Sequence, residues 1–494
     1  MTPTEMLREA LLRLPPGAAW KANSVPRPNE IFAPRGHRNV FDLTRAIVVG
    51  NRGVGKTFWS HALWSKEGRG VAASTYGLDE LRNIEAVFGF RGAFADEHAP
   101  STDVLTAALE GGQDALTVWK AVLLRAYGKN SDLGITSDLV GLTKWLSDNA
   151  EKGDNLLREL DAERERRPLV VMFDALDTLG GDWSQIRTRT EGLLRLAVIA
   201  KSLRNTKMKI FMRPDQFEDT TLFRFPDASK LRAERVAIEW SFRDLYALMF
   251  FHLWREPETR AALLEFIGQP VRLFRETSGQ FRPDLVQYPD IQRQIFNRMA
   301  GEWMGRDKKR GATYSWLIQH LADASGETTP RGFLTAVRKA AEYETIGSEN
   351  VIDYKGISNG VAEASVNRVA DLEQDYWWID YIKGPLAGVE TPIYRDVLMA
   401  IWKDSNTADR LKSASHKMGP LPLFLALRSN IEALPPSLAE RLDSDEAALI
   451  ESLELISVLE TRSNGKINFP DIFRVAFKMK RRGGIPPKRS KSVE

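Results

Sequence analysis

The stretch Gly50-Asn51-Arg52-Gly53-Val54-Gly55-Lys56-Thr57 decides the fold of this chain. Directly before it, residues 46–49 form a short apolar run that is typical of a strand buried in a parallel sheet. Directly after it, residues 58–64 contain bulky apolar side chains and neither Gly nor Pro, which favours a helix packed on a sheet. A strand, a glycine-rich loop and a helix in this order predict a phosphate-binding loop.

The residue types of the loop fit the chemistry of phosphate binding. Its three glycines let backbone N–H groups turn inward where a Cβ would crowd a phosphate, and the following helix N-terminus attracts an anion. We expect Lys56 to reach the β- and γ-phosphates and the Thr57 hydroxyl to bind Mg²⁺. ATP and Mg²⁺ are therefore the predicted cofactors, and the predicted nucleotide contacts are Gly50, Asn51, Arg52, Gly53, Val54, Gly55, Lys56, Thr57 and Phe58.

A second motif begins at Leu169 and reads Leu-Val-Val-Met-Phe-Asp-Ala-Leu-Asp. A buried parallel strand would deliver Asp174 to the carboxyl edge of the sheet, where ligands bind and where a magnesium ion needs an acid. Asp177, three residues later, is the candidate to polarise an attacking water. The alternative is a strand with a purely structural role.

A third strand is predicted at residues 207–212, and Arg213 follows it. Because the residue after a parallel strand lies at the ligand edge of the sheet, Arg213 is a candidate to sense the γ-phosphate or to stabilise charge in the transition state. An ordinary surface arginine at a strand end is the competing interpretation.

Together these motifs resemble the STAND and AAA+ branches of the P-loop ATPases. AAA+ proteins usually place Glu directly after the second-motif aspartate, whereas here Ala175 follows Asp174 and Asp177 completes a STAND-like pattern. Arg213 matches the arginine that STAND proteins carry after their fourth core strand. The motifs of GTPases, ABC ATPases and ParA-type ATPases are missing from the sequence. The resemblance implies ATP hydrolysis, a homo-oligomer and a protein effector or partner, and ATPases of this build occur in bacterial conflict systems, including anti-phage defence.

The fold that follows is α/β, with a parallel-sheet P-loop core, a helical insertion, a helical lid and a C-terminal domain similar to a winged helix. We expect an N-terminal helix and adenine-side linker at 1–40, the core at 41–240 with its insertion at about 70–165, and the lid at 241–345. In the linker, Phe32, Arg35 and His37 stand where related ATPases cover the base. A closing strand is expected near 235–240, and Lys230, Arg232 and Arg235 are candidates to reach a neighbouring subunit, although each could be a plain surface charge.

The lid contains one further candidate. Thr328 or Thr329 can cap a helix that begins at Pro330, which places Arg331 in its first turn. By the resemblance Arg331 is a second sensor that folds over the phosphates. A helix-start arginine that touches only solvent is the alternative.

The C-terminal part is divided into a helical linker at 346–390, a winged-helix-like domain at 391–477 and a basic tail at 478–494. The Asn464-Gly465 pair between two extended runs predicts a β-hairpin, with a helix before it near 443–455. That helix is rich in acids, which argues against insertion into a DNA groove. The basic tail is therefore the remaining candidate for nucleic acid binding, and the alternative is a solvated tail without a partner.

Composition sets the remaining limits. The 494 residues contain no cysteine, which excludes disulfides, thiolate-bound metals and thiol nucleophiles. The net charge is +3, and seven basic residues without an acid lie between Lys478 and Lys491, so the rest of the chain is mildly acidic. No signal peptide or membrane span is recognisable, and we expect a cytoplasmic protein without membrane contact.

Two functions remain open from the sequence. The first is an ATP-hydrolysing molecular switch that oligomerises and controls an effector. The second is an ATP-gated DNA-binding or scaffold protein similar to the origin-recognition ATPases, in which nucleotide occupancy matters more than turnover.

Overall fold

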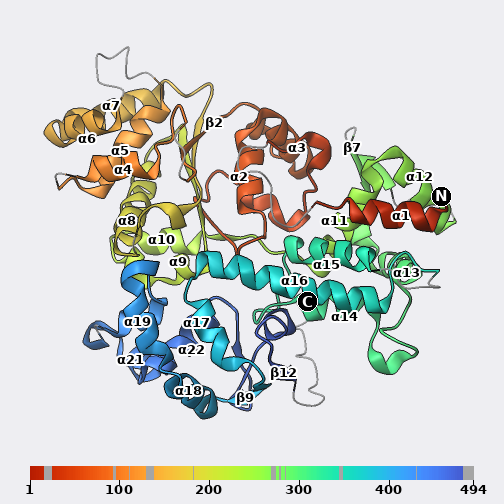
Figure 1. Cartoon of the computed structure of the whole chain (residues 1–494). Helices are drawn as coiled ribbons and strands as arrows, with labels where there is room; N and C mark the ends of the chain where they lie inside the picture. The colour runs from red at the N-terminus through yellow and green to blue at the C-terminus, as the bar shows by residue number, and fades with distance from the viewer. Residues whose placement is uncertain are drawn as a thin grey trace.

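The computed structural model describes residues 1–15, 25–92, 96–110, 112–128, 138–181, 183–268, 274–277, 280–283, 285–343, 349–429 and 431–481. A five-stranded sheet in the order β2-β3-β4-β1-β5 lies in the N-terminal half, and all its strand pairs are parallel (Figure 1). The strands are β1 (Ile47–Val49), β2 (Glu85–Phe90), β3 (Leu169–Phe173), β4 (Thr206–Met212) and β5 (Val236–Ala237). The predicted α/β class with a parallel sheet is confirmed.

Both faces of the sheet are covered, which explains why its strands are continuously apolar. Alternate residues of β3 point to opposite faces: Val171 and Phe173 join one apolar cluster, whereas Val170 and Met172 join another. Helices α5 (Ala115–Ala126) and α8 (Trp183–Ala200) pack in the first cluster, and α2 (Lys56–Trp64) and α3 (Lys66–Tyr76) in the second.

The prediction of a helical insertion at about 70–165 is wrong in its extent. Strand β2 lies within this range and pairs with β3, so it belongs to the core sheet. Gly89 interrupts its apolar run because a Cβ there would lie 2.5 Å from the Phe173 ring. The helices between β2 and β3 are α4 (Thr102–Leu109), α5, α6 (Leu139–Asp148) and α7 (Ala150–Ala162).

The segment 241–345, for which a helical lid was predicted, is mostly helical where the structure describes it, and the name lid is kept below for these residues alone. It also contains one hairpin, β6 (Phe274–Thr277) with β7 (Gln280–Pro283). Its helices are α11 (Phe242–Arg255), α12 (Pro257–Ile267), α13 (Pro289–Ala300), α14 (Thr313–Leu321) and α15 (Pro330–Glu342). The N-terminal helix α1 (Pro3–Leu12) lies against α12 and α15 rather than on the sheet (Figure 1).

The C-terminal module begins after the 22-residue helix α16 (Tyr354–Asp375). The hairpin predicted around Asn464-Gly465 is confirmed by the antiparallel pairing of β10 (Glu460–Thr461) and β11 (Lys466–Asn468), to which β9 (Ile393–Tyr394) adds a third strand. The other elements are α17 (Ile379–Lys383), β8 (Glu390–Thr391), α18 (Arg395–Asp404), α19 (Thr407–Met418), α20 (Leu423–Arg428), α21 (Pro436–Arg441), α22 (Asp445–Leu455), α23 (Asp471–Arg474) and β12 (Lys480–Arg481).

The basic tail expected from residue 478 starts later than predicted. Lys480 and Arg481 form β12, which pairs in parallel with β8, so the first basic residues belong to the folded module. Residues 482–494, with the remaining four basic side chains, lie outside the described residues.

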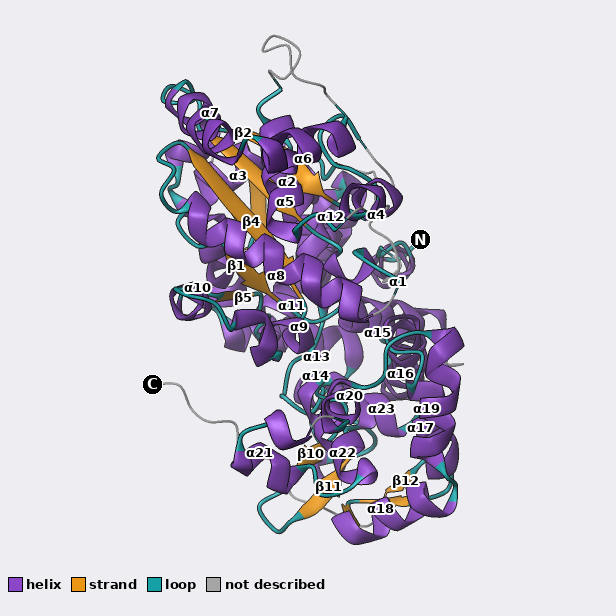
Figure 2. Ribbon diagram, turned by 90° about the vertical axis from the view of Figure 1, so that its left-hand side faces the viewer, coloured by secondary structure: helices purple, strands orange, loops and turns teal. Residues whose placement is uncertain are grey.

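The lid and the C-terminal module share one apolar core. A single cluster of buried side chains runs from Leu7 of α1 through Phe250 and Val337 of the lid to Leu449 and Phe473 of the module. Figure 2 shows the sheet at one end of the molecule and the module at the other. No helix in the described ranges is long and apolar enough to cross a membrane.

Candidate functional site

The glycine-rich loop joins β1 to α2 and has the backbone conformation of an anion cradle. Gly53 and Gly55 adopt the left-handed region, with φ of +84° and +108°. A Cβ at Gly50 would lie 2.6 Å from the Val54 side chain. Within the described part of the chain, the backbone N–H groups of residues 53–57 have no backbone acceptor. Five unpaired N–H groups at a helix N-terminus fit a phosphate group.

Lys56 is held inside this loop. Its Nζ donates to the carbonyl oxygens of Gly50 at 2.7 Å and Asn51 at 3.1 Å. Burial lowers the pKa of Lys56 to about 8, and the nearby carboxylates of Asp174 and Asp177 oppose that shift. The ammonium is thus positioned beside the cradle and surrounded by the predicted acids.

Asp174 lies at the carboxyl end of β3, as predicted, and it is buried. Its Oδ2 lies 3.0 Å from the Ser60 hydroxyl, which is also 3.0 Å from the Thr57 carbonyl oxygen. Ser60 is one turn after Lys56 on α2 and fully buried. The Thr57 side chain is exposed, so an oxygen ligand remains available next to this carboxylate.

Arg213 and Asp177 meet at the same edge of the sheet. Arg213 Nη1 lies 3.7 Å from Asp177 Oδ2, and Asp177 stands in a one-turn helix that follows Ala175, whose φ is +56°. Asp215 fixes the other side of the guanidinium with bonds of 3.1 and 3.0 Å. Although burial opposes the charge, Asp215 and the other acids raise the pKa of Arg213 well above its usual value.

Arg331 comes from the lid. Thr329 caps α15 by accepting a hydrogen bond from the Gly332 N–H, and Pro330 occupies the first helical turn, as the sequence predicts. The Arg331 side chain lies against Gly53, since a Cβ built on that glycine would be 3.3 Å from the arginine Cβ. The structure therefore brings Arg331 to the loop, where the sequence expected a second sensor.

Several site residues were not predicted from the sequence. Ser60 contacts Asp174, and Asp215 holds Arg213. Asp371 and Asp375, at the end of α16, accept hydrogen bonds from Arg331 and Arg52. Their spacing of four residues, which puts both carboxylates on one helix face, was the available signal.

Other candidates lie elsewhere. Arg232 pairs with Glu218 at 3.3 Å and Lys230 with Asp227 at 2.7 Å, both on the core surface around α10 (Ala228–Ala233). His37, expected to cover the base, is fully buried: its Nε2 donates to the Glu239 carbonyl oxygen and its Nδ1 accepts from the Trp59 indole. Burial lowers its pKa to about 4, so His37 is a neutral core residue.

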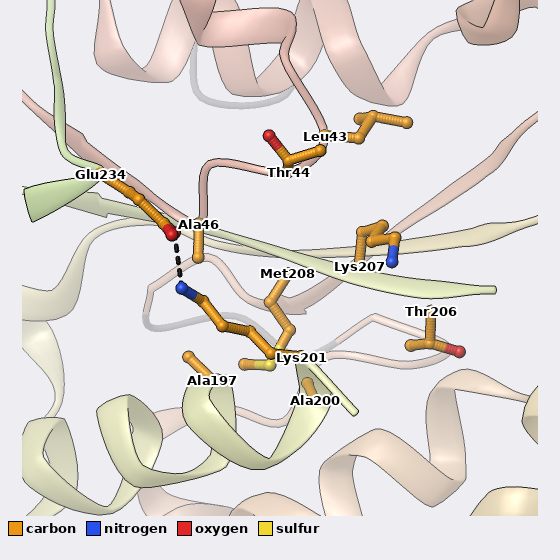
Figure 3. A pocket seen from close by; sticks show the side chains of 10 residues that line it. All are labelled: Leu43, Thr44, Ala46, Ala197, Ala200, Lys201, Thr206, Lys207, Met208 and Glu234. Atoms are coloured by element: carbon orange, nitrogen blue, oxygen red, sulfur yellow. Dashed lines mark hydrogen bonds and ion pairs between the residues drawn. The ribbon is translucent and has the colours of Figure 1, made fainter. Parts of the chain in front are cut away.

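A cavity of about 220 Å³ lies at the opposite edge of the sheet, where β1 and β4 begin. Lys201 Nζ and Glu234 Oε2 lie 2.5 Å apart at this cavity, and Figure 3 marks their pairing with a dashed line. Because the glycine-rich loop follows the carboxyl end of β1 and Arg213 follows that of β4, this cavity is separate from the candidate site.

The comparisons with known proteins add little beyond the geometry. No protein-family model and no curated protein matches the chain. Among solved structures, one match is the ORC2 protein of Aeropyrum pernix in ADPNP and ADP complexes. The two chains are 12% identical with a TM-score of 0.38, over 92% of this chain and 94% of the other.

Proposed function

We propose that this protein is an Mg²⁺-dependent ATPase that works as a molecular switch of the STAND and AAA+ type, forming homo-oligomers and controlling a partner or effector. One observation carries the proposal: the N–H cradle of the loop, Lys56, the buried Asp174 and the Asp177–Arg213 pair all converge at one edge of the sheet. The chemistry of these groups suits a nucleoside triphosphate with a magnesium ion.

In this proposal each side chain has a distinct task. Lys56 and the loop N–H groups hold the phosphates, while Thr57 and Asp174 supply oxygen ligands to the metal, with Ser60 orienting Asp174. When bound, Mg²⁺ neutralises charge that develops on the phosphate oxygens. Asp177 orients a water, and Arg213 stabilises negative charge from the side that Asp215 leaves open.

The alternative, an ATP-gated DNA-binding protein, has less support. The helix before the hairpin, α22, is buried from Ala447 to Leu453 by the rest of its module. Its Glu451 is buried as well and is paired with Arg441 and Arg395. A helix in this position presents neither a basic nor an exposed face to a DNA groove.

Nucleotide binding and turnover of three variants test the proposal. Lys56→Ala should abolish ATP binding, whereas Asp177→Ala should bind ATP and lose turnover by about 10²- to 10⁴-fold. Asp148→Ala, at an exposed aspartate at the end of α6, is the matched control and should keep wild-type activity. Assays with and without duplex DNA separate the alternatives, because salt-sensitive DNA binding that survives in Asp177→Ala would favour the second function. Wild-type protein that fails to bind ATP would refute both.

A further inference from the structure

Two carboxylates, Asp371 and Asp375, lie among the last five residues of α16, near a helix end that disfavours acids. Asp371 and Asp375 are four residues apart and therefore share one face. The C-terminal end of a helix carries partial negative charge, which favours cations and not acids. Since α16 has no basic residue in its last turn, the compensating charge has to come from outside the helix.

That charge comes from three arginines on three different elements of the candidate site. Asp371 Oδ2 accepts a 2.8 Å bond from Arg331 Nη1 of the lid, and its Oδ1 lies 3.9 Å from Arg52 Nε of the phosphate-binding loop. Asp375 pairs with Arg52 through Oδ1 and lies 3.9 Å from Arg213 Nη1 through Oδ2. Gln374 adds a 2.8 Å hydrogen bond to Arg52.

The second carboxylate lies near two side chains, Lys56 and Arg213, that the proposed function assigns to the phosphates. Asp375 is among the charges that act on Lys56, together with Asp174 and Asp177. Asp215 already holds the other two nitrogens of Arg213, so Nη1 is the end of that guanidinium left for a phosphate. Asp375 takes part of this end, and its side chain is only 9% exposed, so little water screens the contact and a second anion would meet its charge at short range.

We propose that Asp371 and Asp375 form an autoinhibitory contact, in which they hold the arginines that the γ-phosphate of ATP engages, and that ATP binding displaces the end of α16. This inference rests on the proposed function. A γ-phosphate beside the two carboxylates would meet like charge at short range, so the arginines exchange one partner for the other.

The contact also connects the nucleotide site to the C-terminal module. The Tyr376 ring, directly after α16, lies 4.8 Å from Arg213. A cavity of about 40 Å³ separates Arg213 and Asp215 from Leu423 and Ile456 of the module. Helix α16 leads directly into α17 of the module (Figure 1), so a displacement of its end would carry Tyr376 and the module away from the core.

The test uses the isosteric double variant Asp371→Asn/Asp375→Asn. It should bind a non-hydrolysable ATP analogue about tenfold more tightly than wild type, because the competing charges are gone. Because the chain has no cysteine, spin labels at Lys152→Cys on α7 and Lys417→Cys on α19, both exposed, report the distance between core and module. Without nucleotide the double variant should show the distance that wild type reaches only with the analogue.

Two further proteins make the outcome decisive. Asp371→Glu/Asp375→Glu keeps both charges and should keep the weaker wild-type affinity, which separates charge from loss of packing. Glu363→Gln removes an exposed charge from the same helix and should change neither readout. If the Asp371→Asn/Asp375→Asn variant bound the analogue with wild-type affinity and showed the wild-type distance, the autoinhibitory contact would be overturned and the proposed function would stand. Absence of nucleotide binding in both wild type and variant would instead overturn the proposed function, and the competition with it.

Discussion

At the scale of single residues, Lys56 is the side chain whose protonation should control ATP binding. Its pKa in the free protein is lowered to about 8, chiefly by burial, and only the protonated form attracts phosphate. Above this pKa, binding therefore requires proton uptake. Raising the pH from 7.5 to 9.5 should weaken ATP binding about 20-fold, because the competent fraction falls.

Titration calorimetry across this pH range measures the effect. Lys56→Arg keeps its charge throughout and should bind ATP with an affinity that does not change with pH. A wild-type affinity that stays constant to pH 9.5 would show that the Lys56 pKa is not depressed in the free protein.

At the scale of secondary-structure elements, the contact between α15 and α16 depends on glycine. A Cβ at Gly360 would lie 2.1 Å from the Ala336 carbonyl oxygen, and one at Gly356 would lie 2.6 Å from that of Ala340. The two helices pack with their backbones close together, which fixes the direction in which α16 carries Asp371 and Asp375 to the loop.

Gly360→Ala should therefore push the helices apart and lower the free energy of unfolding by about 1–3 kcal/mol. Gly384→Ala is the matched control, because nothing lies within 4 Å of the added methyl group. Its stability should stay within about 0.5 kcal/mol of wild type. Chemical denaturation of the three proteins checks this, and equal midpoints would contradict the close helix contact.

At the scale of the whole molecule, the N-terminal helix belongs to the lid. Leu7 and Leu11 of α1 are buried in the cluster that the lid shares with the C-terminal module, whereas the sheet has separate clusters on its two faces. The first residues of the chain thus stabilise a region that is far away in sequence.

Leu11→Ala should lower the free energy of unfolding by about 2–5 kcal/mol, and the lid and the module should be the parts that are destabilised. In hydrogen exchange, α12 and α15 should lose protection while β3 and β4 keep theirs. Leu196→Ala in α8 is the control, because Leu196 is equally buried but belongs to a cluster on the sheet. In this variant β3 and β4 should lose protection, while α12 and α15 should keep theirs. Faster exchange of β3 in the Leu11 variant would contradict the division into these clusters.

The central part of the fold could be predicted because residues that are neighbours in the sequence specify it. The loop, β3, β4 and the start of α15 were each specified by neighbouring residues: glycines where φ is positive, apolar runs that end in an acid, and a capping threonine before proline. Strand β2 was missed because Gly89 breaks its apolar pattern, and that glycine is explained only by the Phe173 ring across the strands.

What the sequence alone determined is the glycine-rich loop between a strand and a helix, and the placement of Asp174 and Arg213 at strand ends, because the ends of strands and helices follow from short-range patterns. The order of the strands in the sheet was not among these predictions. What only the tertiary structure decided is which charges face that loop. Arg52 and Asp375 are more than 300 residues apart, and no local pattern relates them. Their pairing depends on how α16 packs on the lid, which is set by contacts between distant segments.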